Sequence, residues 1–370
     1  MKQAVLAELR VEPFDIPLNE PFAIAGGAKT EAKNLLVRAV LSDGAVGWGE
    51  GAPSINDGSR EKLVPAAKKV FSKLEGRPIA SWRALLETLD DSLGPGTGPA
   101  KAAVGMAILD VWARRVKIPL RAVFGGAENR VFTDVTVTMA PPEASSRAAK
   151  RIVALGVKVI KIKIGGDMDE DEARVRAVNA AGRGLKLMLD ANCGYSARQS
   201  LQFLARLKKS GIKPVLFEQP APKADWQGLK DVLTRGGGVP VAADESVQGP
   251  QDMIKAACFK AISVVNIKLM KSGFIEGWDI ARIAKAAGIG LMIGGMVESP
   301  LAMGAGAHFA AGLGGFAFVD LDTPLWFSRN PMRGLLLGRG GLYDLAAVKA
   351  GIGVLPEPEL LALFSRRRRA

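Results

Sequence analysis

The feature that most constrains the fold is a repeating unit that begins near residue 131. Short apolar runs recur from there on, and amphipathic segments lie between them. The runs are Val131–Thr138, Val159–Ile164, Leu185–Leu189, Val215–Phe217, Val239–Ala243, Ala261–Ile267, Ile289–Ile293 and Phe316–Val319. Apolar positions near i, i+3, i+4 and i+7 predict helices at Pro142–Leu155, Asp169–Ala181, Ala197–Lys209 and Ile275–Ala287. Eight strand-plus-helix units predict an α/β fold, a (β/α)8-type TIM barrel whose parallel sheet is buried.

Charged residues follow the predicted strands at a regular interval. They are Lys163, Asp190, Glu218, Asp244, Lys268, Glu298 and Asp322, at spacings of 27, 28, 26, 24, 30 and 24 residues. A single charged residue after a strand usually caps a helix or faces solvent. In a barrel, however, the carboxyl ends of the strands meet at one mouth, where active sites are built. The repeated spacing therefore predicts one shared site.

The chain before the repeat follows a different pattern. Leu35–Leu41 and Ala45–Glu50 are predicted strands joined by a Ser-Asp-Gly turn, and helical patterns follow at Arg60–Leu74, Ser81–Leu89 and Lys101–Arg115. We therefore expect an α+β capping domain over residues 1–125 and a barrel over 126–328. A C-terminal segment, 329–370, is expected to pack back on the cap and to end in a basic, disordered tail at 366–370.

Histidine and cysteine are scarce, which excludes several kinds of site. The 370 residues include one histidine, His308, and two cysteines, Cys193 and Cys258. Zinc sites built from several imidazoles or thiolates are therefore excluded. A Ser-His-Asp triad would need His308, which lies in an Ala/Gly run and which we expect to be a packing residue. Acid–base chemistry must come mainly from carboxylates and lysines.

The net charge of +13 does not by itself indicate a nucleic-acid partner. Four of the positive charges are Arg366–Arg369, and no basic stretch is interleaved with aromatic residues. A membrane partner is not expected either, because the apolar stretch Ser299–Val319 contains five glycines and a proline and is predicted as a buried helix plus a strand. Met1–Leu18 has no signal-peptide core, and two cysteines agree with a reducing compartment, so we expect a cytoplasmic protein.

Three of the regularly spaced residues are carboxylates from consecutive strands: Asp190, Glu218 and Asp244. Oxygen ligands without histidine or cysteine suit Mg²⁺ or Mn²⁺, and an incomplete protein shell leaves room for substrate oxygens. Asn192, two residues beyond Asp190, is a candidate hydrogen-bond partner for that carboxylate.

Lysines flank this acidic trio in the sequence. Lys161 and Lys163 alternate on one strand and so point to the same face, where neighbouring ammonium groups are expected to lower each other's pKa. Lys268 comes from a strand nearly across the barrel, whereas Lys271 is expected in the following loop or helix. A metal between two lysines suits proton removal and return beside a carboxylate, giving racemisation or epimerisation. A single lysine base would suit elimination or cycloisomerisation equally well.

The chain resembles the enolase superfamily, in which a lysine base works with Mg²⁺, and in particular its muconate-lactonizing-enzyme subgroup. The matching segments are Gly47–Gly51, Lys161–Lys163, Asp190–Asn192, Phe217–Pro220, Ala243–Ser246 and Asn266–Ser272. The resemblance implies that Lys163 and Lys268 are the acid/base pair. It also implies that Asp190, Glu218 and Asp244 hold one Mg²⁺ per subunit, with Mn²⁺ as an alternative, and that lid loops at residues 21–30 and 49–59 close over the mouth.

Within the subgroup, the pair Asp320 and Asp322 is similar to that of the dipeptide epimerases, including the L-Ala-D/L-Glu type, where it holds the substrate's α-ammonium group. The same resemblance places four further residues around the substrate: Thr136, Lys161, Met296 and Glu298. It implies Mg²⁺-dependent epimerisation of a dipeptide, by 1,1-proton transfer at the α-carbon next to the C-terminal carboxylate.

Other functions remain open at this point. An N-acylamino acid racemase, an o-succinylbenzoate synthase or a muconate cycloisomerase would use the same scaffold on substrates without a free α-ammonium group. A non-catalytic protein that binds anionic polymers through Arg366–Arg369 is a further alternative. The sequence also leaves open whether the chain forms a homo-oligomer.

The second residue of the dipeptide is not determined by the sequence. Relatives acting on L-Ala-D/L-Glu often have an arginine in the first lid, whereas this chain has Ala23 where that arginine is expected. Lys29 is a candidate substitute, although it is a point charge rather than a planar fork. Acidic, apolar and other second residues all remain open.

Overall fold

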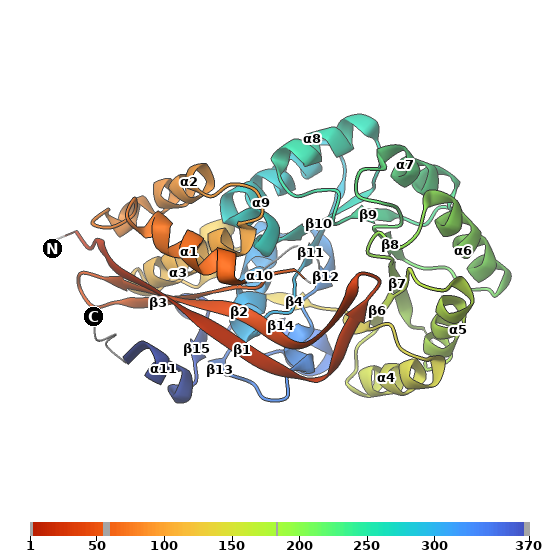
Figure 1. The fold of residues 1–370 in the computed structure, drawn as a ribbon, viewed down its shortest axis with the longest axis horizontal. Helices are drawn as coiled ribbons and strands as arrows, with labels where there is room; N and C mark the ends of the chain where they lie inside the picture. The colour runs from red at the N-terminus through yellow and green to blue at the C-terminus, as the bar shows by residue number, and fades with distance from the viewer. Residues whose placement is uncertain (1–2, 55–59, 183, 366–370) are drawn as a thin grey trace.

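The computed structural model describes residues 3–54, 60–182 and 184–365 (Figure 1). Eight parallel strands form one sheet in which every strand lies beside its neighbour in the sequence. They are β5 (Val135–Val137), β6 (Val159–Lys163), β7 (Lys186–Asp190), β8 (Leu216–Glu218), β9 (Val241–Ala243), β10 (Val264–Lys268), β11 (Gly290–Gly294) and β12 (Phe316–Asp320). The first and last strands meet where Asp134 N–H donates to Val319 O at 2.9 Å. The predicted TIM barrel is confirmed.

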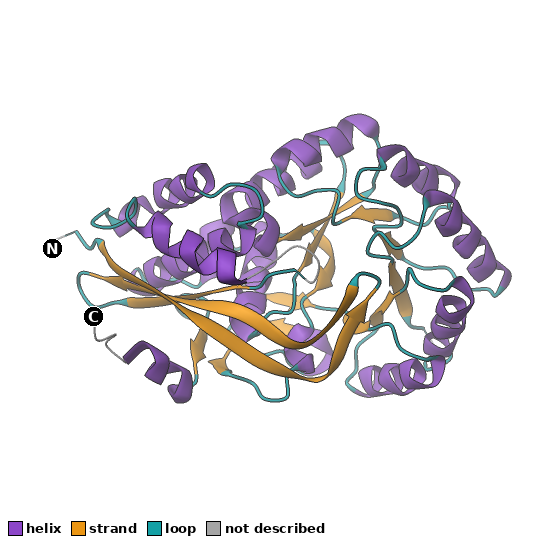
Figure 2. Ribbon diagram, viewed as in Figure 1, coloured by secondary structure: helices purple, strands orange, loops and turns teal. Residues whose placement is uncertain are grey.

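Helices alternate with these strands and surround the barrel (Figure 2). They are α4 (Pro142–Ala154), α5 (Met168–Asn179), α6 (Ala197–Lys209), α7 (Trp226–Arg235), α8 (Pro250–Phe259), α9 (Leu269–Ala286) and α10 (Pro300–Leu313). Local sequence explains where several of them begin. Ser196 and Gln199 form a capping box at the start of α6, and the Asp167 carboxylate accepts two backbone N–H groups at the start of α5.

The inside of the barrel is filled by side chains rather than open. Buried residues of β7 to β11 form a separate apolar cluster: Met188, Leu216, Ala242, Val264 and Met292. Because side chains alternate along a strand, residues two or four positions further on share the face of this cluster. That face therefore presents the polar strand ends directly above an apolar plug.

One predicted strand is wrong in its extent. Val131–Thr138 is two strands: β4 (Arg130–Phe132), which pairs with β14 (Leu342–Asp344) outside the barrel, and β5 within it. Thr133 lies at the break, where its hydroxyl accepts Leu321 N–H at 2.7 Å. The chain changes partner here because these residues close the seam of the barrel. Helix α9 also begins earlier than predicted and is kinked at Gly273.

The N-terminal part is a three-stranded antiparallel sheet with helices packed on it. The strands are β1 (Leu6–Ile24), β2 (Gly27–Leu41) and β3 (Val46–Gly51), and the helices are α1 (Arg60–Phe71), α2 (Trp82–Ser92) and α3 (Gly98–Arg115). Residues 21–30, expected to be a lid loop, are instead the tip of the β1–β2 hairpin, which extends toward the barrel in Figure 1. Of the expected lid at 49–59, residues 49–51 belong to β3 and residues 55–59 lie outside the described residues.

The glycines of β3 let that strand rest directly on the backbone of α3. A Cβ atom on Gly49 would lie 2.0 Å from Ala103 O, and one on Gly47 would lie 2.4 Å from Ala107 O. No side chain fits in such a gap, which explains why glycine alternates in this segment.

The C-terminal part contacts both the N-terminal sheet and the barrel. It contains β13 (Met332–Gly334), β14, β15 (Val354–Pro356) and α11 (Pro358–Ser365). Short 3-10 turns occur along the whole chain, at η1 (Ile79–Ser81), η2 (Leu120–Phe124), η3 (Thr323–Trp326) and η4 (Arg339–Gly341). Ile352 N–H donates to Asp110 of α3 at 2.9 Å, and Phe364 packs edge-on against Trp48 with ring centroids 5.1 Å apart. The expected tail at 366–370 lies outside the described residues.

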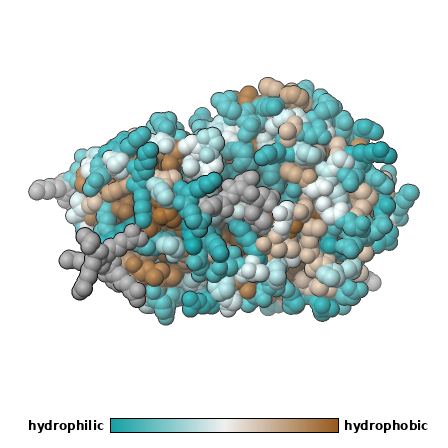
Figure 3. All heavy atoms as spheres, in the orientation of Figure 1, coloured by the Kyte–Doolittle hydropathy of each residue, from teal (hydrophilic) through white to brown (hydrophobic). Residues whose placement is uncertain are grey.

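The face drawn in Figure 3 is largely hydrophilic. Its darkest apolar patches lie on the side of the N-terminal sheet, and paler apolar patches lie over the barrel. The apolar stretch 299–319 forms α10 and β12, as predicted. Within the described ranges, no helix combines the length and apolar content needed to cross a membrane.

His308 is a fully buried packing residue of α10, as expected from its surroundings in the sequence. Its Nδ1 accepts Arg121 N–H at 3.0 Å, and its Nε2 lies 3.0 Å from Ile352 O, so the neutral ring uses both nitrogens. Burial lowers the pKa of His308 to about 4. The histidine therefore joins the η2 turn, α10 and the C-terminal part.

This arrangement predicts acid sensitivity. The pKa of His308 is lower in the folded protein than in the unfolded chain, so its contribution to stability is full above about pH 6.5 and is lost as the pH falls toward 4. At about 1.4 kcal/mol per pKa unit, the loss is about 3 kcal/mol. We expect His308→Gln to be less stable than the wild type at pH 7 but to lose less stability by pH 4.5, measured as free energies of unfolding in denaturant. Parallel pH profiles for the two proteins would contradict this role.

Candidate active site

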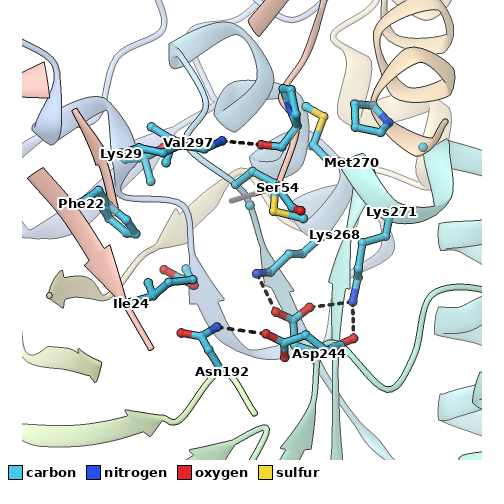
Figure 4. A pocket seen from close by; sticks show the side chains of 18 of the residues that line it. Phe22, Ile24, Lys29, Ser54, Asn192, Asp244, Lys268, Met270, Lys271 and Val297 are labelled. Carbon is cyan, nitrogen blue, oxygen red and sulfur yellow. Dashed lines mark hydrogen bonds and ion pairs between the residues drawn. The ribbon is translucent and has the colours of Figure 1, made fainter. Parts of the chain in front are cut away.

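The charged strand ends meet around a cavity of about 170 Å³ at the carboxyl ends of the barrel strands (Figure 4). Of the eleven catalytic, metal-binding and substrate-binding residues expected from the sequence, seven line it: Thr136, Lys163, Asp244, Lys268, Met296, Asp320 and Asp322. Lys161, Asp190 and Glu218 are fully buried and do not line the cavity. Glu298 does not line it either, and its carboxylate accepts Met296 N–H at 2.6 Å. The structure thus brings ten residues to one region and places Glu298 behind its wall.

Lys161 is the most highly connected group of the site. Its Nζ lies 2.6 Å from Asp320, 2.8 Å from Glu218 and 2.9 Å from Asp190, with the side chain completely buried. Burial by itself would lower the pKa of Lys161, but the carboxylates outweigh it and hold the pKa well above its usual value. The expectation of a lowered pKa at this lysine was wrong, because carboxylates surround it more closely than the neighbouring ammonium group does.

The other two lysines approach the cavity from opposite sides. Lys163 ends β6, and its Nζ lies 2.6 Å from Asp190. Lys268 ends β10, four strands further around the eight-stranded sheet, and its Nζ lies 2.7 Å from Asp244. Burial would lower the pKa of Lys268, but Asp244 raises it above the ordinary value. A molecule in the cavity therefore lies between the side chains of two lysines.

Lys271 belongs to this site, although the sequence placed it only in the following loop or helix. It lies in the first turn of α9, and its Nζ donates to the Asp244 carboxylate at 2.7 Å and to the backbone oxygens of Asp244 and Asn266. Asn266 in turn donates to Glu218 at 2.8 Å. The position of Asn266, two residues before Lys268 on the same strand, indicates its inward direction.

Gln219 was also missed, and it organises the loop that carries Asp244. Its side-chain oxygen accepts the N–H groups of Asp244 at 3.0 Å and Ser246 at 3.1 Å, while its amide nitrogen donates to Ser246 Oγ and Ala221 O. Gln219 has φ of 39°, an unusual backbone conformation that aims the side chain at the next strand.

Asn192 contacts Asp190 through its backbone rather than through its side chain. Its N–H donates to Asp190 Oδ1 at 2.9 Å, whereas its amide donates to Glu245 at 3.1 Å. Burial, followed by the charges of Asp244 and Asp190, raises the pKa of Glu245 to about 7.

Asp320 and Asp322 lie at the end of β12, and we call this pair the acidic corner. Part of its carboxylate surface has no hydrogen-bond partner within the described part of the chain. Asp320 contacts Lys161, and Asp322 Oδ2 accepts Thr136 N–H at 2.6 Å. Asp322 Oδ1 and both carboxylate oxygens of Asp134 are buried without a hydrogen-bond partner among the described residues. Burial and then the Asp320 charge raise the pKa of Asp322 to about 6. Such a corner favours a ligand that brings a positive charge and N–H donors.

Asp190, Glu218 and Asp244 fit a hard divalent cation by their chemistry. They end or follow three neighbouring strands and supply only oxygen donors. In the described parts of the chain, no three acidic side chains converge closely enough to hold an ion as they stand, because lysines contact these carboxylates. Burial, then the neighbouring Asp190 charge, raises the pKa of Glu218, which shows how crowded the negative charge is. A cation would relieve that crowding.

Known proteins share this architecture. Residues 7–125 match the description "Mandelate racemase / muconate lactonizing enzyme, N-terminal domain", and residues 143–360 match "Enolase C-terminal domain-like". An aromatic dipeptide epimerase from Herpetosiphon aurantiacus is 43% identical over 94% of this chain and 97% of its own length. An L-Ala-D/L-Glu epimerase from Bacillus subtilis is 34% identical over 92% of this chain and 94% of its own length. A dipeptide epimerase from Enterococcus faecalis, complexed with Mg and the dipeptide L-Leu-L-Tyr, superimposes with a TM-score of 0.89 at 30% identity, covering 95% of this chain and 99% of that one.

The role of Gln219 gives a direct test. Gln219→Leu keeps the size of the side chain but removes its hydrogen bonds and leaves two buried backbone N–H groups without their acceptor. Each unsatisfied group costs about 1–3 kcal/mol, so we expect a loss of at least about 2 kcal/mol in the free energy of unfolding. The matched control is Gln227→Leu, at an exposed glutamine of α7, with an effect within about 0.5 kcal/mol. Equal effects of the two substitutions would contradict the account.

Proposed function

The chain belongs to the mandelate racemase/muconate lactonizing enzyme family of the enolase superfamily, and we propose that it is an isomerase that epimerises dipeptides. The reaction inverts the α-carbon next to the C-terminal carboxylate. The observation that carries this proposal is the acidic corner of Asp320 and Asp322, which lies on the cavity together with lysines from opposite sides of the barrel.

The two cavity lysines are suited to move a proton from one face of a carbon to the other. One of them, as a neutral amine, takes the α-proton while the C–H electron pair moves into the adjacent carboxylate and forms an enediolate. The other, as an ammonium ion, returns a proton to the opposite face. The positions of Lys163 at the end of β6 and Lys268 at the end of β10 support this assignment, because a proton returned from the opposite side inverts the carbon.

Asp190, Glu218 and Asp244 would hold one Mg²⁺ per subunit, or Mn²⁺ in its place. When bound, the cation supplies Lewis-acid stabilisation of the negative charge that develops on the substrate carboxylate. Lys271 and Asn266 donate to the Asp244 and Glu218 carboxylates and fix their directions, as hydrogen-bond partners of ligating carboxylates do, whereas Gln219 holds the backbone N–H of Asp244.

The remaining residues shape the rest of the substrate site. Asp320 and Asp322 receive the free ammonium group of the dipeptide, Thr136 orients Asp322, and Lys161 orients Asp320. Met296 contacts the substrate as part of the cavity wall. Glu298 acts through Met296, whose backbone it holds, rather than by touching the substrate.

The alternatives on the same scaffold lack a partner for the acidic corner. Substrates of an N-acylamino acid racemase, an o-succinylbenzoate synthase or a muconate cycloisomerase carry no free α-ammonium group. Any of the three would leave the unpartnered Asp322 Oδ1 at the cavity without a compensating cation. The acidic corner therefore favours a dipeptide with a free amino end.

The lysine roles predict a simple exchange result. In D2O with Mg²⁺, the wild type should replace the α-proton of the C-terminal residue of at least one dipeptide in a library, followed by ¹H NMR. Lys163→Ala and Lys268→Ala should each lower epimerisation at least about 100-fold, because each removes one proton-transfer group. Lys209→Ala, at an exposed lysine of α6, should leave the rate unchanged. If no dipeptide exchanges its α-proton, the proposed function is wrong.

Asp322→Asn separates the dipeptide reaction from its alternatives. The substitution removes the negative charge but keeps the shape, so kcat/KM for a dipeptide with a free amine should fall at least about 10-fold. Activity toward an N-acylamino acid, measured in the same exchange assay, should change little. The opposite pattern, with dipeptide turnover unaffected and a marked loss on the N-acylated compound, would favour an N-acylamino acid racemase.

A further inference from the structure

The tip of the β1–β2 hairpin forms one wall of the cavity. Phe22 and Ile24 of β1 line it, and so does Lys29, which faces Phe22 across the hairpin. Figure 4 shows these three side chains grouped on the side of the cavity away from Asp244. Ala23, at the position where an arginine for an acidic substrate was expected, does not line the cavity, because alternate residues of a strand point to opposite faces.

The hairpin tip is held on the barrel by close backbone contacts. Ala23 O accepts Met139 N–H at 3.1 Å. A Cβ atom on Gly194 would lie 2.9 Å from the Ala25 methyl group, and one on Gly165 would lie 3.2 Å from it. Ala25 thus packs against two glycines of the loops after β6 and β7. These contacts fix Phe22 and Ile24 over the mouth.

Lys29 uses its charge within the protein. Its Nζ donates to Pro53 O at 2.7 Å, which joins the hairpin to residues 53 and 54, another segment of the N-terminal part that lines the cavity. Burial lowers the pKa of Lys29 to about 8. The Lys29 ammonium group therefore links the hairpin tip to the segment at Pro53 in the same wall of the cavity. Its buried surroundings stabilise a positive charge poorly.

The proposed reaction determines which part of the substrate meets this wall. The reacting α-carbon lies between Lys163 and Lys268, the C-terminal carboxylate faces the acidic trio, and the ammonium group faces Asp320 and Asp322. The side chain of the reacting residue is then left to project toward the N-terminal part. On that side it meets Phe22, Ile24 and Pro53 of the N-terminal part together with Met270 and Val297 of the barrel, all of which are apolar.

We propose, as a consequence of the proposed function, that the epimerised residue has an uncharged apolar side chain, aromatic or branched aliphatic. Phe22, Ile24 and Met270 are its specificity-determining residues, and Lys29 is a positioning residue rather than a receptor for a substrate carboxylate. An acidic side chain at this place would have to give up its hydration against an apolar wall, whereas an apolar one gains by leaving water.

The test compares L-Ala-L-Phe, L-Ala-L-Leu and L-Ala-L-Glu in the α-proton exchange assay with Mg²⁺. The wild type should prefer L-Ala-L-Phe or L-Ala-L-Leu over L-Ala-L-Glu by at least about 10-fold in kcat/KM. Lys29→Met should raise KM for all substrates by a similar factor and leave their ratio within about threefold. Lys29→Arg should recover much of the loss, because it still donates to Pro53 O. Lys33→Met, at an exposed lysine of the same strand, is the control without effect.

Two results would overturn the inference while leaving the proposed function standing. One is a wild-type preference for L-Ala-L-Glu. The other is a loss in Lys29→Met that is confined to L-Ala-L-Glu, since that is the behaviour of a carboxylate receptor. Absence of exchange with every dipeptide would instead refute the proposed function, and this inference with it. Direct titration of the Mg²⁺-loaded protein with the same dipeptides should show the same order of affinities.

Discussion

The structure depends on the convergence of charged strand ends over an apolar plug. Lys161, Asp190, Glu218 and Asp320 are buried at one point, with three carboxylates within 2.9 Å of a single ammonium nitrogen. Isolated, each of these charges would be costly to bury, and only their mutual contacts make the arrangement stable. Asp134 and one oxygen of Asp322 are buried without a hydrogen-bond partner within the described residues. The proposed binding of a cation and of an ammonium group rests on these crowded acidic groups.

The N-terminal part holds one side of the cavity in place through buried polar contacts. The Glu50 carboxylate of β3 accepts Ser299 N–H at 2.9 Å at the start of α10, and it also accepts the Asn34 amide at 2.7 Å. Asn34 donates as well to Val297 O, in the loop that carries Met296. The two parts of the chain therefore share one wall of the site, and the glycines of β3 allow the close packing that this requires.

The sequence predicted the barrel and the clustering of its strand ends because both follow from local periodicity. Lys163, Asp190 and Lys268 lie where a strand must end, and alternation alone gives their direction. Hydrogen-bond and packing partners that come from distant segments of the chain could not be found in this way. The seam at Thr133 and Asp134 divides a run that looks continuous, because its hydrogen bonds go to β12 and to the C-terminal part. The hairpin tip at 21–30 looks like a loop from its glycines, and it is ordered by contacts with Met139 and two barrel loops.

The residue types that form the site could be predicted from the sequence, but the charges and hydrogen bonds around each of them could not. The pKa of Lys161 depends on carboxylates from three other strands, and Lys271 reaches Asp244 only because α9 begins directly after β10.

The proposed reaction requires a dipeptide to lie between Lys163 and Lys268 with its ammonium group at the acidic corner. A crystal structure with Mg²⁺ and L-Ala-L-Phe would show this arrangement. We expect the metal on Asp190, Glu218 and Asp244, the α-carbon between the two lysine nitrogens and the amine against Asp320 and Asp322. A dipeptide whose amine points away from that corner, or whose α-carbon lies outside the reach of both lysines, would contradict it.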